Sequence, residues 1–151
     1  MIFFTRELYD GVQDASGWSR RAERLWDRNR PIYQACFDAI SPLLPRSVVR
    51  LCRHTLHDAV IESVVQESNT LSFIIDARNA LGGFRGRRLQ LDFSGLRRRI
   101  PTRGLVGDWW LYEEAHLSGN APFSLHVLFH RHEIEIEADT LHIKLLPQRL
   151  K

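Results

Sequence analysis

The sequence predicts an α+β fold in which N-terminal helices pack on a strongly curved antiparallel sheet of six or seven strands. Apolar residues recur every three or four positions up to about residue 56, which is the spacing of amphipathic helices. From about residue 57 to residue 146, apolar and polar residues alternate, as in strands with one buried face. Helices followed by strands favour α+β over a parallel sheet. No linker divides the chain, so we expect a single domain over residues 1–151.

The part up to residue 56 is expected to form helices. Thr5 can accept a backbone N–H as an N-cap, and Glu7 in the first turn favours the positive end of a helix. The next apolar series runs to Ile40 and contains Pro31, which removes a backbone donor, so we expect two helices or one kinked helix. Pro45 is well placed at the first turn of a further helix.

The part from residue 57 to residue 146 is expected to bury one face of its strands. The apolar positions assigned to the interior are Phe73, Ile75, Leu89, Leu91, Phe93, Val127, Phe129, Ile134 and Ile136. Glu133, Glu135 and Glu137 alternate with the last of these and are expected to face water. A register slip of one residue would expose the whole apolar set, so the pattern specifies which face is buried.

Composition excludes several classes of protein. No apolar run approaches the roughly 20 residues of a membrane span, so no membrane partner is expected. The chain does not start with a charged region followed by a long apolar stretch, which predicts a cytoplasmic location. Cys36 and Cys52 fall at apolar helix positions and are expected to be buried thiols.

Charge is segregated along the chain. Residues 85–103 contain seven arginines against the single Asp92, and residues 108–139 contain seven acids against the single Arg131. The arginines could form a phosphate-binding stripe for RNA or DNA. Alternatively, they could pair with the acids across the strands. The net charge of only +3 favours the pairing, so we expect nucleic-acid binding to be weak and electrostatic.

Residues 109–116 carry the best candidate for a recognition patch. Regular alternation in a strand would place Trp110 and Tyr112 on one face together with Glu114 and His116. Either the N-terminal helices cover this face, which is the simpler arrangement, or it is exposed as a binding patch. The candidate partner-binding residues are Trp110, Tyr112, Glu114 and His116, with Arg97, Arg98 and Arg99 as a possible rim.

No catalytic, metal or cofactor site is predicted. Neither cysteine has a neighbouring histidine with an orienting carboxylate, and no Gly-x-Ser-x-Gly segment is present. His126, His130 and His132 lie close in sequence, but a continuous strand would separate the first two by about 13 Å. That distance is too long for one zinc ion. We therefore expect these histidines to mark an exposed hairpin tip rather than a metal site.

Several short segments resemble a known family. Residues 3–9 read Phe-Phe-Thr-Arg-Glu-Leu-Tyr, residues 110–114 read Trp-Leu-Tyr-Glu-Glu, and an acidic hairpin follows at residues 123–136. These features resemble an uncharacterised bacterial family known only as a domain of unknown function. The resemblance spans nearly the whole chain and implies no activity. The turn at residues 130–132 departs from it, because such hairpins more usually have an Asp-Gly-like turn.

Taken together, these features predict a small, non-catalytic bacterial binding protein that recognises a protein partner. Segregated charge and surplus aromatic residues favour recognition over catalysis. Immunity proteins, which neutralise a cognate toxin, are small domains of this general kind, although the analogy rests on size and composition alone. The alternatives are a nucleic-acid-binding module that uses residues 85–103 and an enzyme with an unrecognised site. The oligomeric state stays open.

Overall fold

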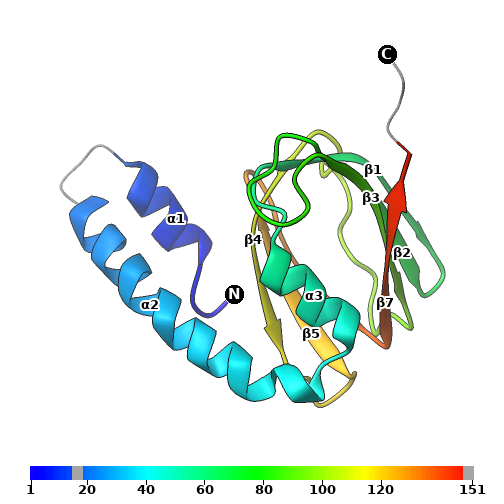
Figure 1. Ribbon diagram of the computed structural model, residues 1–151, viewed down its shortest axis with the longest axis horizontal. Helices are drawn as coiled ribbons and strands as arrows, with labels where there is room; N and C mark the ends of the chain where they lie inside the picture. The colour runs from blue at the N-terminus through cyan, green and yellow to red at the C-terminus, as the bar shows by residue number, and fades with distance from the viewer. Residues whose placement is uncertain (15–18, 148–151) are drawn as a thin grey trace.

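The computed structural model describes residues 1–14 and 19–147 and has an α+β fold. Three helices precede seven strands in this part of the chain (Figure 1). The helices are α1 (Arg6–Gln13), α2 (Ser19–Ile40) and α3 (Arg46–His54), with a 3₁₀ turn, η1 (Ser41–Leu43), before α3. The strands are β1 (Ala59–Glu67), β2 (Thr70–Ala77), β3 (Arg87–Ser94), β4 (Trp109–His116), β5 (Phe123–Phe129), β6 (Glu133–Ala138) and β7 (Thr140–Leu146).

The strands form one antiparallel sheet in the order β6-β5-β4-β1-β2-β3-β7. Its two outermost strands, β6 and β7, follow each other in the chain and are separated by Asp139 alone. The sheet must therefore curl until the end of β6 and the start of β7 meet at Asp139. The N–H of Asp139 donates to the carbonyl of Ser94 at 2.9 Å, and the N–H of Arg97 donates to the carbonyl of Glu137 at 3.0 Å.

The helices lie on different sides of the curved sheet (Figure 1). α3 packs into the sheet's core, where Val48 and Leu51 are fully buried. α1 and α2 pack on each other and lie beside β4 (Figure 1). No helix in the described part of the chain is long and apolar enough to cross a membrane.

The helical expectations are largely confirmed. The hydroxyl of Thr5 accepts the N–H of Leu8 at 3.3 Å and caps α1. α2 continues through Pro31, so the two-helix alternative is wrong. Buried side chains on both sides of this proline, among them Trp26 and Phe37, hold the helix together where one backbone hydrogen bond is missing.

The predicted interior of the sheet is also confirmed. All nine apolar residues assigned to the interior are buried, and the period-two pattern matches the burial of β2, β3 and β6. The expectation of one wet face is wrong for β5, which also buries Ser124 and Leu128 on its other face. Glu133 is exposed, and Glu135 and Glu137 are partly exposed. The expectation of a buried Cys36 is wrong: its thiol lies on an exposed side of α2, one residue before the buried Phe37.

Candidate functional site

A β-bulge in β4 changes the predicted recognition patch. Trp110 pairs with Phe129 and Tyr112 pairs with Leu128, which leaves Leu111 as an extra residue. The alternation therefore shifts by one position. Trp110 points into the core and is fully buried, whereas Tyr112 points toward the N-terminal helices. The expectation that these two residues share a face is wrong for this reason.

Tyr112 belongs to the packing between the helices and the sheet. Its ring centre lies 4.7 Å from that of Trp26, 5.7 Å from that of Phe4 and 4.9 Å from that of His57. Burial raises the pKa of its phenol. The N-terminal helices therefore cover Tyr112, as the simpler arrangement expected from the sequence has it, and only part of its surface stays exposed.

Glu114 is fully buried and anchors the start of the chain. Its carboxylate accepts the N–H groups of Ile2, Phe3 and Phe4 at 2.8, 2.9 and 2.6 Å, and His116 Nε2 lies 3.1 Å away. Burial acts to raise the pKa of Glu114, but His116 and the three backbone donors outweigh it and lower the pKa. Because its oxygens are used within the fold, Glu114 offers no free charge to a partner.

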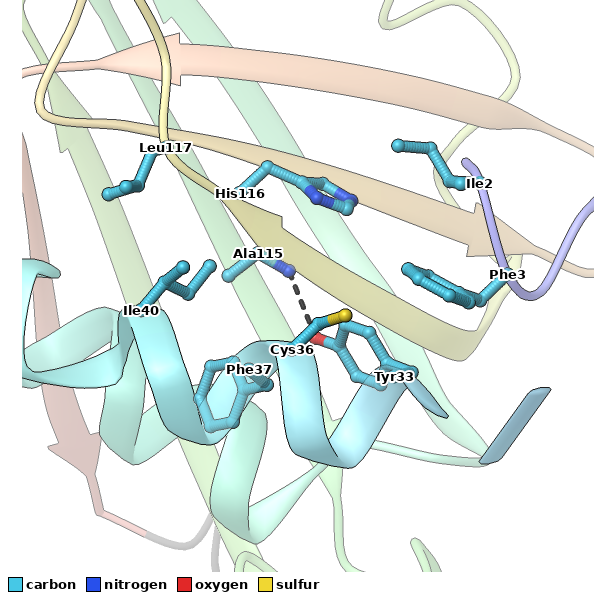
Figure 2. Close-up of a pocket in the computed structure, with 9 residues that line it drawn as sticks. All are labelled: Ile2, Phe3, Tyr33, Cys36, Phe37, Ile40, Ala115, His116 and Leu117. Carbon is cyan, nitrogen blue, oxygen red and sulfur yellow. Dashed lines mark hydrogen bonds between the residues drawn. The ribbon is translucent and has the colours of Figure 1, made fainter. Parts of the chain in front are cut away.

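An apolar hollow of about 310 Å³ lies between the N-terminal segment, α2 and β4. Figure 2 shows Tyr33 reaching across it, where its hydroxyl accepts the N–H of Ala115 at 3.1 Å. His116 and the exposed Cys36 also line the hollow. Most of the wall is hydrocarbon, which gives a polar substrate little to orient it.

A second polar cluster is buried where α3 meets β4. The indole N–H of Trp110 donates to Glu113 at 2.6 Å, and Glu113 is 7% exposed. Burial raises the pKa of Glu113 to about 7, while its hydrogen bonds with Trp110 and Thr55 act in the opposite direction. Burial, with a further contribution from Glu113, raises the pKa of the Cys52 thiol. These groups are enclosed by the fold and tie α3 to the sheet.

Two of the proposed rim arginines are paired with acids. Arg97 forms an ion pair with Asp139, and Arg98 forms one with Glu135 on β6. Both arginines lie in the loop after β3, and Asp139 lies between β6 and β7, so neither pair joins adjacent strands. Arginines of this segment are therefore paired with acids at these two positions, but the expected ladder across strands is not formed there.

The remaining arginines of residues 85–103 do not complete a stripe. Arg99 is exposed and has no ion pair among the described residues. Arg85 and Arg87 lie at the start of β3, whereas Arg97 and Arg99 follow its other end. The length of this strand therefore divides the arginines into two groups, which removes the continuous phosphate track considered from the sequence.

The three histidines near the β5–β6 hairpin have different neighbours. His126 Nε2 lies 3.1 Å from Glu135. The ring centre of His130 lies 6.1 Å from that of the half-exposed Trp109. His132 lies elsewhere, against Asp108. Within the described residues, no group of three or more histidine, cysteine, aspartate or glutamate side chains could hold a metal ion.

The Asp108–His132 pair joins the loop before β4 to the β5–β6 hairpin. Asp108 is 1% exposed, and its carboxylate lies 2.6 Å from His132 Nδ1. Burial acts to raise the pKa of Asp108, but His132 and the N–H groups of Trp109 and Arg131 lower it. Gly104 lies against His132 Nε2, where a Cβ atom would come within 2.8 Å. Both imidazole nitrogens therefore face the protein, which indicates a structural role.

A basic surface surrounds α3 instead. Three segments that contain no Asp or Glu meet there, namely residues 39–57, 77–91 and 140–147. α3 contacts β7, and the ring centres of His54 and Phe84 lie 5.7 Å apart. The guanidinium of Arg50 lies 5.7 Å from the centre of the Phe84 ring. The three segments therefore form one continuous region of the molecule.

Six exposed cations of this region form no ion pair with a described residue, and we call them the α3 basic surface. They are Arg46, Arg50, Arg53, Arg85, Arg87 and Lys144. Two other arginines of the same segments are neutralised, because Arg78 pairs with Asp76 and Arg88 pairs with Glu62, each at 2.5 Å. Leu43, Leu81 and Leu145 of these segments are 69%, 55% and 48% exposed.

The model of a family described as proteins of unknown function, DUF4085, matches residues 6–138. The chain belongs to the DUF4085 family. This membership confirms the resemblance drawn from the opening segment and from the segment that forms β4. A comparison with curated proteins finds no match. The membership therefore relates most of the chain to a family, but it assigns no activity.

Sequence reasoning missed the α3 basic surface of this DUF4085 protein. The density of arginines points to residues 85–103, but five of the seven arginines there are paired or lie beyond the other end of β3. The signal that could have found the surface is the absence of acids. Residues 39–57 and 77–91 are acid-free, as are residues 93–107 and 115–132, and only the fold shows that the first two stretches lie together.

Proposed function

We propose that this DUF4085 protein is a small, non-catalytic binding protein that recognises an acidic protein partner through the α3 basic surface. The observation that supports the proposal is the convergence of three acid-free segments, which leaves six exposed cations without ion pairs among the described residues. Cations without nearby acids raise the local concentration of an acidic partner and speed its association. The proposal keeps the cytoplasmic location expected from the sequence.

The chemistry of the surface favours a protein over a nucleic acid. Exposed leucines stand among the arginines at Leu43, Leu81 and Leu145, and protein interfaces have an apolar core and are enriched in arginine. Single-stranded nucleic acids are usually held by aromatic rings on which bases stack. Phe84 is the one aromatic residue in the three acid-free segments, and it is buried.

The test is capture of a partner by matched charge variants. Tagged wild-type protein, Arg46→Glu/Arg50→Glu on α3 and Arg24→Glu/Arg28→Glu on the exposed side of α2 would be incubated with nuclease-treated extract of the source cells. Both variants reverse two arginines four residues apart, so they change the net charge equally. We expect a protein with an acidic segment to be retained by the wild type and the α2 variant and lost by the α3 variant.

Affinity measured with the purified partner then decides the proposal. We expect the dissociation constant to rise at least tenfold for Arg46→Glu/Arg50→Glu and less than twofold for Arg24→Glu/Arg28→Glu. Wild-type binding should also weaken as salt increases, because exposed charges are screened. Equal losses in both variants would contradict a role for the α3 basic surface. In a parallel incubation with untreated extract, retention of RNA or DNA by the wild type and the α2 variant but not by the α3 variant would favour the nucleic-acid alternative instead.

A further inference from the structure

We propose that the partner segment is an extended acidic peptide that adds as a strand to the outer edge of β7, beside Arg46 and Arg50 of α3. This inference rests on the proposed function and specifies the form in which the partner is recognised. Three features support it: an unpaired strand edge, a hollow along that edge, and the charge of the hollow.

The outer edge of β7 is unpaired. β7 pairs with β3 over its whole length, from Thr140 with Ser94 to Leu146 with Arg88. It is the last strand on its side of the sheet, and no other strand pairs with it among the described residues. Backbone N–H and C=O groups along such an edge can pair with an extended peptide. This pairing supplies affinity, and neighbouring side chains supply specificity.

A hollow of about 300 Å³ lies where the edge of β7 meets α3. Its walls are Arg46, Ser47 and Arg50 from α3 and Leu141, His142 and Ile143 from β7. Arg46 and Arg50 are four residues apart, so they lie on the same side of the helix. Figure 1 shows α3 and β7 as neighbours, in agreement with their contacts. A strand added at β7 would therefore run past both guanidinium groups.

The charge of the hollow selects acidic side chains. Neither α3 nor β7 contains an Asp or Glu, so an incoming carboxylate meets no repulsion from the two elements that form the walls. Arginine binds carboxylates through paired hydrogen bonds, which adds direction to the attraction. Side chains of a strand alternate between its two faces. A peptide with acidic residues on one face and apolar residues on the other can thus contact the arginines and the apolar wall near Ile143 together.

The test uses three probes with the folded, full-length protein. The first is an eight-residue peptide of alternating glutamate and valine. The second is the same peptide with alternate backbone nitrogens methylated, which blocks strand pairing along one edge and keeps every side chain. The third is a single-stranded oligothymidylate with the same number of negative charges. Dissociation constants would be measured by calorimetry, and the amides of residues 140–146 followed by NMR.

We expect the unmodified peptide to bind at least tenfold more tightly than the methylated one and to slow hydrogen exchange in residues 140–146. Arg46→Gln/Arg50→Gln should weaken its binding at least tenfold, and Arg24→Gln/Arg28→Gln less than twofold. All four arginines are exposed and glutamine is a good helix former, so circular dichroism should show folded variants.

Other outcomes overturn the inference in distinguishable ways. Equal affinity for both peptides would show that β7 does not accept a strand; if the α3 substitutions still weakened binding, the proposed function would stand. Equal effects of the α3 and α2 substitutions would contradict both proposals. Failure of the peptide to bind at millimolar concentration would reject the added strand. Tighter binding of the oligothymidylate than of the peptide would indicate a nucleic-acid ligand.

Discussion

Glu113 offers a direct test of the buried polar cluster between α3 and β4. Burial raises its pKa from the ordinary 4.5 to about 7, so the folded protein holds this proton more tightly than the unfolded chain does. Between these two pH values the folded state binds more protons, and stability must fall as the pH rises. The substitution Glu113→Gln keeps the shape of the side chain and an acceptor for the Trp110 indole, but it cannot ionise.

The size of the effect follows from the two pKa values. At about 1.4 kcal/mol for each tenfold change in proton affinity, the rise from 4.5 to about 7 corresponds to about 3 kcal/mol. The wild type should lose this amount of unfolding free energy between about pH 4 and pH 8, in addition to changes that both proteins share. The difference between Glu113→Gln and the wild type should therefore increase by about 3 kcal/mol across this range.

Urea unfolding followed by circular dichroism at several pH values measures this difference. The control is Glu67→Gln, which removes an exposed carboxyl at the end of β1. Its difference in unfolding free energy from the wild type should not change with pH. If the difference for Glu113→Gln also stayed constant within about 0.5 kcal/mol from pH 4 to pH 8, the argument from burial would be refuted.

Four further predictions concern packing and charge. Trp26→Ala should destabilise the fold by about 3–5 kcal/mol in urea unfolding, because Trp26 fills the space beside Tyr112; a loss below about 1 kcal/mol would contradict that role. Glu114→Ala should speed hydrogen exchange at the Phe3 amide at least tenfold, and unchanged exchange would show that the carboxylate does not hold the N-terminal segment. Because hydrogen bonding lowers the pKa of Glu114, its stabilisation should be lost as the pH falls below the ordinary glutamate value. Arg98→Ala should change stability by less than about 1 kcal/mol, since its ion pair is exposed, and a larger loss would indicate additional contacts.

The local sequence pattern was sufficient to predict the helices, the strands and most of the buried residues. Strand alternation placed residues such as Phe73 and Ile136 inside because the pleat of a strand makes the choice of face a property of neighbouring residues. The cap at Thr5 was predictable for a similar reason, since the hydroxyl and the N–H of Leu8 lie within one helical turn. The effect of Pro31 on the helix was harder to predict, because the contacts that keep α2 continuous come from outside the proline's own turn.

The candidate site depended on contacts between distant parts of the chain. One extra residue at Leu111 turned Trp110 inward, and a β-bulge leaves no mark in an alternating pattern that carries large apolar side chains on both faces. The α3 basic surface requires residues 39–57 and 77–91 to meet, although more than 20 positions separate Arg50 from Phe84. By itself, the sequence determined which residues are apolar, charged or free of acidic neighbours along the chain. Only the tertiary structure decided which charges neutralise each other, because ion pairs depend on distances of a few ångströms that curling of the sheet sets.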